Sequence, residues 1–138
     1  MLLQSGKEYL KIKILRRSSP NNNDYWDGNW LESEIKINTS NFNGTYRTNL
    51  RTDDFLRFRE DILESENNHS TSFLFTTMEE GIFFEGRINL VGVIEWTCIA
   101  KTGNDVLNFS LESDLLSIKK LTIQIENILK IYPVVGEI

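Results

Sequence analysis

The sequence is poor in the residues from which metal sites and disulfides are built, with one histidine and one cysteine among 138 residues. Cys98 alone cannot form an internal disulfide, and with His69 it cannot complete a zinc site. No run approaches the roughly 20 apolar residues of a membrane span. The N-terminus lacks the basic-then-apolar pattern of a secretory signal. We therefore expect no metal, no cofactor and no membrane partner, and the cytoplasm as the simplest location.

Sequence motifs of common enzyme classes are also absent. The chain has no P-loop, no GxGxxG and no GxSxG motif. His69 lies in the polar stretch "ENNHST", which favours an exposed loop histidine, and Cys98 lies in "VIEWTCIA", which favours a buried, inert thiol. Carboxylates are plentiful, but no two of them stand out as an acid–base pair. The sequence therefore predicts a protein that is not an enzyme.

Charge is unevenly distributed along the chain. The net charge of −5 and the pI of about 4.9 argue against general nucleic-acid binding. Residues 7–17 carry five basic side chains and one acid, whereas residues 53–85 carry nine acids and two arginines. Such segments are often simply solvated faces, but an acidic face can also steer a basic partner into contact. The candidate partner-binding residues are Glu60, Asp61, Glu64, Glu79 and Glu80.

Apolar and polar residues alternate in many short segments, as in β-strands with one wet face. The segments "YLKIKIL" and "LESEIKIN" alternate, and "NFNGTYRTNL" could continue the same sheet, although Asn43-Gly44 is also a hairpin-turn signal. Four further segments with tight turns between them, "SFLFTT", "IFFEGRINL", "GVIEWTCIA" and "VLNFSLES", are typical of an antiparallel meander.

Two segments have the 3.6-residue apolar period of an amphipathic helix. They predict helices over residues 52–65, with Thr52 as N-cap, and 114–132, with Ser113 or Asp114 as N-cap. No internal repeat is visible. We therefore expect one α+β domain spanning residues 1–138, with a mostly antiparallel meander of about seven strands and two amphipathic helices.

The segment "NNNDYWDGNWLESE" places two tryptophans among polar residues. Asp24 can form an Asx-turn, and Asp27-Gly28 can supply the left-handed residues of a tight turn. In one interpretation Trp26 and Trp30 cover the edge of the core, and we expect at least one of them to be mostly buried. In the other they form an exposed aromatic hot spot for a protein partner.

The same segment resembles a known family. "DYWDGNWLESEIKI", followed by "LRTDDFLRFREDI" and a final "SDLLSIKKLTIQIENILKIYP", resembles the WapI-type immunity proteins. The resemblance implies a small cytoplasmic antitoxin that binds the C-terminal domain of a wall-associated, contact-dependent bacterial toxin, in the type case a nuclease acting on tRNA. It also implies that the shared motif maintains the fold. The motif residues are Asp24, Trp26, Asp27, Gly28, Asn29 and Trp30.

Two functions therefore stand as hypotheses. The leading one is an immunity protein that binds a toxin domain by direct protein–protein contact. The alternative is a non-enzymatic carbohydrate-binding or adaptor domain that uses Trp26 and Trp30. The chemistry of the toxin and the oligomeric state stay open.

Overall fold

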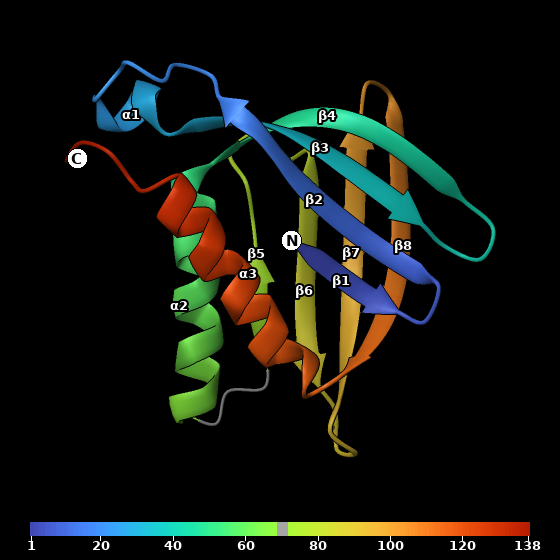
Figure 1. Cartoon of the computed structure of the whole chain (residues 1–138). Coiled ribbons are helices and arrows are strands. Elements are labelled where there is room, and N and C mark those ends of the chain that lie inside the picture. The colour runs from blue at the N-terminus through green and yellow to red at the C-terminus, as the bar shows by residue number, and fades with distance from the viewer. Residues whose placement is uncertain (69–71) are drawn as a thin grey trace.

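A computed structural model describes residues 1–68 and 72–138, and the prediction for His69 lies outside the described residues. These residues form two four-stranded antiparallel sheets and three helices (Figure 1). The first sheet contains β1 (Leu2–Ser5), β2 (Glu8–Arg17), β3 (Trp30–Asn38) and β4 (Asn43–Arg51). The second contains β5 (Ser72–Phe75), β6 (Ile82–Ile88), β7 (Val93–Thr102) and β8 (Asp105–Asp114). The helices are α1 (Tyr25–Gly28), α2 (Thr52–Asn68) and α3 (Ser117–Ile131).

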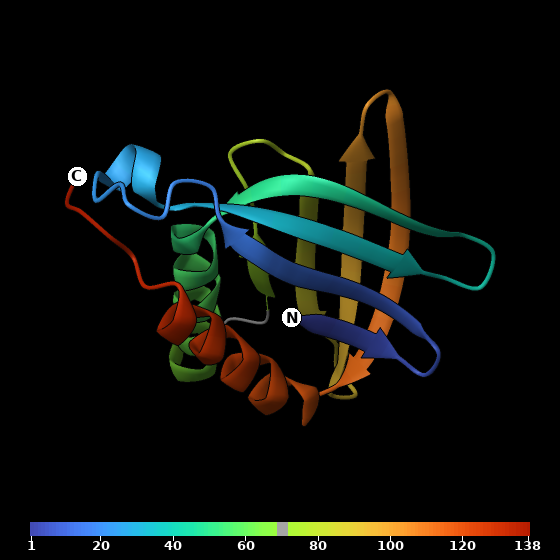
Figure 2. The same ribbon diagram turned by 45° about the horizontal axis from the view of Figure 1, so that its top comes forward.

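The α+β class and the antiparallel pairing are confirmed, but the strands do not form one sheet. Each sheet is a four-stranded meander, in the orders β1-β2-β3-β4 and β5-β6-β7-β8, and each meander is followed by a long helix. The fold thus repeats one structural unit, although no repeat is visible in the sequence. The strands of the two sheets cross at a steep angle, and α2 and α3 lie together on one side of them (Figure 2).

The alternation in the first sheet gives it one buried and one solvent-exposed face. Leu10 and Ile12 of β2 pair with Ile37 and Ile35 of β3, and all four side chains are buried. The intervening Lys11 is exposed, as the period of two requires. The inner face of the sheet therefore belongs to the core, and its outer face meets solvent.

The hairpin signal at Asn43-Gly44 does not mark the turn. Both residues are paired within β4, opposite Asn38 and Ile37. The chain reverses just before them, where the Thr39 N–H donates to the Phe42 carbonyl at 2.7 Å. The alternative in which this segment continues the sheet is therefore correct.

Aromatic side chains dominate the contact between α2 and the second sheet. Phe58 of α2 lies 5.5 Å from Phe75 and 5.3 Å from Phe84 between ring centroids, and both contacts are edge-to-face. Such geometry adds to the gain from burying the rings. Cys98 is buried in the same core, and burial raises the pKa of its thiol to about 12. It is the inert thiol that the sequence predicts.

The first turn of α2 is held by a different residue from the one predicted. The Thr52 hydroxyl is buried and has no hydrogen-bond partner among the described residues. Instead, the carboxylate of Asp54 accepts a hydrogen bond of 2.7 Å from the Arg51 N–H. The helix also continues to Asn68, about one turn past the predicted end at residue 65.

The last helix begins later than predicted, at Ser117. Asp114 still acts at this end, because its side chain accepts from the Ser117 N–H at 3.0 Å. Ile118, Leu121 and Ile125 form the buried stripe. Next to this stripe, the Gln124 side chain accepts the N–H of Leu2 at 2.8 Å, so the helix covers the edge of β1. Among the described residues, no helix combines the length and apolar character needed to cross a membrane.

Candidate partner-binding surfaces

The tryptophan-bearing segment forms a short helical turn, α1, between β2 and β3. Asp24 caps it: one carboxylate oxygen accepts the N–H groups of Trp26 and Asp27, each at 3.0 Å. Gly28 does not adopt a left-handed conformation, so the predicted Asp27-Gly28 turn is wrong. The glycine is needed for another reason, because a Cβ at this position would collide with the Asn22 backbone.

Asn29 joins this turn to the C-terminal segment. Its side chain is fully buried, and its Nδ2 donates to the carbonyls of Tyr25 and Val135 at 2.8 and 2.9 Å. Its Oδ1 accepts from the Val135 N–H at 2.9 Å. Arg17 adds hydrogen bonds to the carbonyls of Gly28 and Pro133. A buried amide with all these partners fixes two distant segments against each other.

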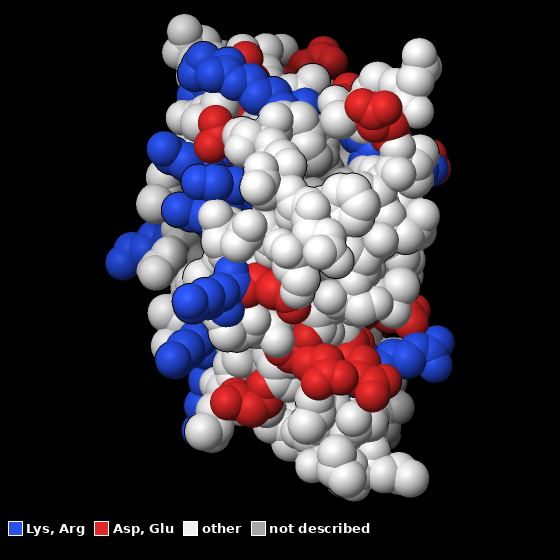
Figure 3. All heavy atoms as spheres, turned by 90° about the vertical axis from the view of Figure 1, so that its right-hand side faces the viewer, with Lys and Arg blue, Asp and Glu red and all other residues white. Residues whose placement is uncertain are grey.

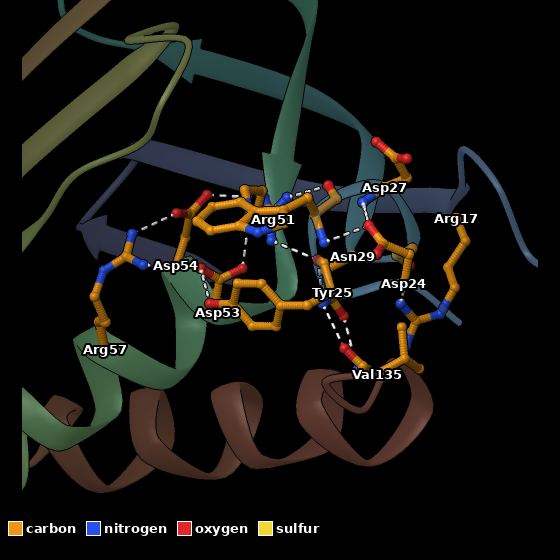
Figure 4. Close-up of polar contacts among 12 residues, drawn as sticks. Arg17, Asp24, Tyr25, Asp27, Asn29, Arg51, Asp53, Asp54, Arg57 and Val135 are labelled. Carbon is orange, nitrogen blue, oxygen red and sulfur yellow. Dashed lines mark hydrogen bonds and ion pairs between the residues drawn. The ribbon is translucent and has the colours of Figure 1, made fainter. Parts of the chain in front are cut away.

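Arg51 is the centre of the cluster that organises the motif (Figure 4). Only 1% of its side chain is exposed. The guanidinium donates to the Trp26 and Tyr25 carbonyls at 2.7 and 2.9 Å and pairs with Asp53 at 2.9 Å. It also lies 5.1–5.6 Å from the ring centroids of Tyr25, Trp26 and Trp30, within the range of cation–π attraction. No motif or period in the sequence singles out this residue.

The two tryptophans differ in exposure. Trp30 is partly buried, whereas 53% of Trp26 is exposed and its ring packs edge-to-face on Tyr25 at 5.1 Å. Trp30 thus meets the expectation that at least one of the two rings is mostly buried. Because both indoles lie against Arg51, they belong mainly to the folded cluster. They do not form the pair of open stacking surfaces that a carbohydrate site would use.

Asp53 and Asp54 connect this cluster to α2. The half-exposed Arg57 pairs with Asp53 at 2.9 Å and with Asp54 at 2.6 Å. Asp53 also accepts the Tyr25 hydroxyl at 3.1 Å. Burial raises the pKa of the Asp54 carboxyl to about 6, although Arg57 and the Arg51 N–H both favour the ionised form.

This shift predicts a pH dependence of stability. From about pH 4 to pH 6 the unfolded chain loses the Asp54 proton while the folded protein keeps it. The contribution of Asp54 to the free energy of unfolding therefore falls as pH rises, by up to about 3 kcal/mol. Below pH 4 the contribution is fully present. Urea unfolding of the wild type and of Asp54→Asn across this range measures it. The difference in unfolding free energy should shrink with pH, and a constant difference would contradict the shift.

The predicted acidic residues do not form one cluster. Glu60 and Glu64 are exposed on α2, but Asp61 is partly buried and accepts the Leu74 N–H at 2.7 Å. Asp61 therefore holds the edge of β5, which leaves it less available to a partner than the other candidate residues. Glu79 and Glu80 are exposed in the turn between β5 and β6, near the end of the molecule where α2 begins (Figure 1).

The outer face of the first sheet has the opposite charge. Figure 3 shows Lys and Arg side chains gathered along its left margin, over the β1–β4 sheet. Lys11 and Lys36 stand directly opposite each other, a like-charged pair that costs stability. The outward-facing charged residues on this sheet are Lys11, Lys13, Arg16, Lys36 and Arg47, with the acids Glu32 and Glu34. The molecule therefore has a distinct basic surface despite its negative net charge.

The described part of the chain contains no candidate metal site. Residues 1–68 and 72–138 contain no group of three or more His, Cys, Asp or Glu side chains placed to hold a metal ion. The clusters above bind backbone carbonyls, carboxylates and rings of the protein itself. Their chemistry is that of a scaffold with charged surfaces.

Comparison with known proteins supports the resemblance seen in the sequence. Residues 1–133 match the model of a family described as the Immunity protein WapI-like family. Among curated proteins, none matches. A solved structure described as crystal structures of Trypanosoma bruciei MRP1/MRP2 is similar, with 11% identity and a TM-score of 0.52 over 92% of this chain and 76% of that chain. At this identity, the structural likeness concerns the fold alone.

Proposed function

The chain belongs to the WapI-like immunity protein family, and we propose on this basis that it neutralises a cognate bacterial toxin by binding the toxin's C-terminal domain directly. Membership implies toxin neutralisation and a cognate toxin partner. It also confirms the expectation that the protein is not an enzyme. The family match over residues 1–133 is the observation that carries the proposal.

The charge distribution supports a basic toxin domain, such as a nuclease with a cleft for phosphates. The turn bearing Glu79 and Glu80 is exposed and acidic, and we assign it to the contact surface. Glu60 and Glu64 on α2 add negative potential at longer range and steer the approaching toxin. The basic outer face of the β1–β4 sheet repels such a toxin, so it favours one orientation of encounter.

The proposed place of action is the cytoplasm of the bacterium that makes the toxin or receives it from a neighbour by contact. The absence of a disulfide fits a reducing compartment, because the one cysteine is a buried thiol. Neutralisation there requires only that the antitoxin be present before the toxin domain enters. Direct binding meets this requirement without further chemistry.

Co-expression tests the proposal. The C-terminal domain of the toxin encoded beside this gene should arrest growth when produced alone, and growth should recover when this chain is produced with it. The two proteins should also co-purify. An unrelated acidic protein of similar size serves as the control. Persistent growth arrest despite abundant folded antitoxin, together with no complex, would refute the proposed function.

A further inference from the structure

A hollow of about 200 Å³ opens on the outer face of the β5–β8 sheet, beside the turn between β5 and β6. This volume is below the roughly 300–1,000 Å³ of typical small-molecule pockets. The hollow therefore suits a single inserted side chain better than a cofactor or substrate. No helix in the described part of the chain covers this face, because α2 packs on the opposite, inner side.

The floor of the hollow is apolar. Phe83 of β6 and Ile99 of β7 stand directly opposite each other, and both side chains are only partly buried. Two exposed apolar side chains lie diagonal to this pair on the same sheet face: Leu74 of β5, which stands opposite Glu85, and Val106 of β8, which stands opposite Lys101. Partly exposed apolar side chains on a sheet face that no helix covers are typical of a protein contact.

The rim of the hollow carries one acid and one base, Glu80 and Lys101, with Glu79 next to Glu80 in the sequence, and it is held in place. Glu80 lines it, with a φ of 56° that a residue with a side chain rarely adopts. The adjacent Gly81 carbonyl accepts both the Tyr46 hydroxyl at 2.7 Å and the Lys101 N–H at 3.0 Å. These bonds tie the turn to both sheets. The strained residue is thus fixed before any partner arrives, which reduces the entropy lost on binding.

The rim charges are also available to a partner. Glu80 meets Lys101 at 3.8 Å, and both side chains are well exposed, so the pair is weak. Glu79 makes no ion pair with any residue in the described ranges. A basic group of a partner could therefore pair with Glu79 or Glu80 without first breaking a strong ion pair within the protein.

We propose that this hollow is the anchor point for the toxin: it takes an apolar side chain of the toxin domain, and a neighbouring basic residue of the toxin pairs with Glu79 or Glu80. The inference rests on the proposed function, since it names where that partner binds. The buried apolar contact slows dissociation, because well-packed central anchors provide most of the affinity of an interface. The rim carboxylates act mainly on the association rate.

Kinetic measurements with the purified toxin C-terminal domain test the anchor. Thr76→Trp fills the hollow from its exposed wall, and Ile99→Arg places a charge on its floor. Each should raise the dissociation rate constant about 10–100-fold and change the association rate constant by less than about 3-fold. Ser110→Arg, exposed on the same sheet face but outside the hollow, is the matched control and should change neither constant by more than about 3-fold.

The results of these measurements distinguish a wrong anchor site from a wrong proposed function. Thermal unfolding first establishes which variants are folded, and Thr76→Trp should be folded because its side chain is exposed. A folded Thr76→Trp with an unchanged dissociation rate overturns the anchor while leaving toxin binding intact. Failure of the wild-type protein itself to bind the toxin domain overturns the proposed function instead.

Discussion

Replacing Arg51 with methionine should lower the free energy of unfolding by about 3–5 kcal/mol, the range for removing one partner of a buried ion pair. The substitution keeps most of the volume but leaves the Tyr25 and Trp26 carbonyls and the Asp53 carboxylate without their buried donor. The measurement is urea unfolding followed by tryptophan fluorescence, with the midpoint and slope compared with those of the wild type.

Arg57→Met is the matched control. Arg57 also pairs with Asp53 and with the buried Asp54, but 54% of its side chain is exposed, so its removal should cost less than the removal of Arg51. Arg51→Lys should resemble Arg51→Met more than the wild type, because an ammonium group cannot reach both carbonyls and the carboxylate with the geometry of a guanidinium. Equal losses for Arg51→Met and Arg57→Met would show that burial of Arg51 contributes nothing special.

The Arg51 cluster explains why a polar segment contains two tryptophans. The rings of Trp26 and Trp30 surround a cation rather than the apolar core, and Asn29 ties the same turn to Val135 near the end of the chain. The residues alone allowed a structural interpretation, with the rings at the edge of the core, and the family resemblance favoured it. Periodicity could not identify Arg51, because the contacts of this residue join segments about 25 residues apart.

The strands and long helices were predictable because their signals are local. Alternation identified β2 and β3, and the apolar stripe identified α2. The division into two sheets was not predictable, because alternation says which face of a strand is buried and does not say which strand lies beside it. In the structure the division falls at α2, which separates β4 from β5 and packs on the second sheet.

The exposed acids were only partly predictable for a related reason. Helical period places Asp61 away from the buried stripe, yet its carboxylate holds the Leu74 N–H of the neighbouring strand. Only the tertiary contact reveals that role. Glu79 and Glu80 stay exposed because a tight turn has no neighbouring element to cover them. The sequence thus predicted the exposure of the acids correctly in the turn but less well on the helix.

Reversing Glu79 and Glu80 together to lysine should slow association with a basic toxin domain about 10–100-fold at low ionic strength. The double substitution changes the local charge by four units at the proposed contact. The two side chains are exposed, so the free energy of unfolding should change by less than about 0.5 kcal/mol. Stopped-flow or surface-based kinetics at several salt concentrations measures the effect.

Glu60→Lys combined with Glu64→Lys is the comparison that separates position from net charge. It makes the same change of four units on the exposed side of α2, so it should slow association less if these acids act only at a distance. Both effects should fade toward 1 M salt, where the screening length is about 3 Å, and the association rates should converge. A larger effect from the α2 pair would move the toxin contact to that helix. If the association rate is unchanged by both charge reversals and by salt, charge does not contribute to association, and the argument for a basic toxin fails.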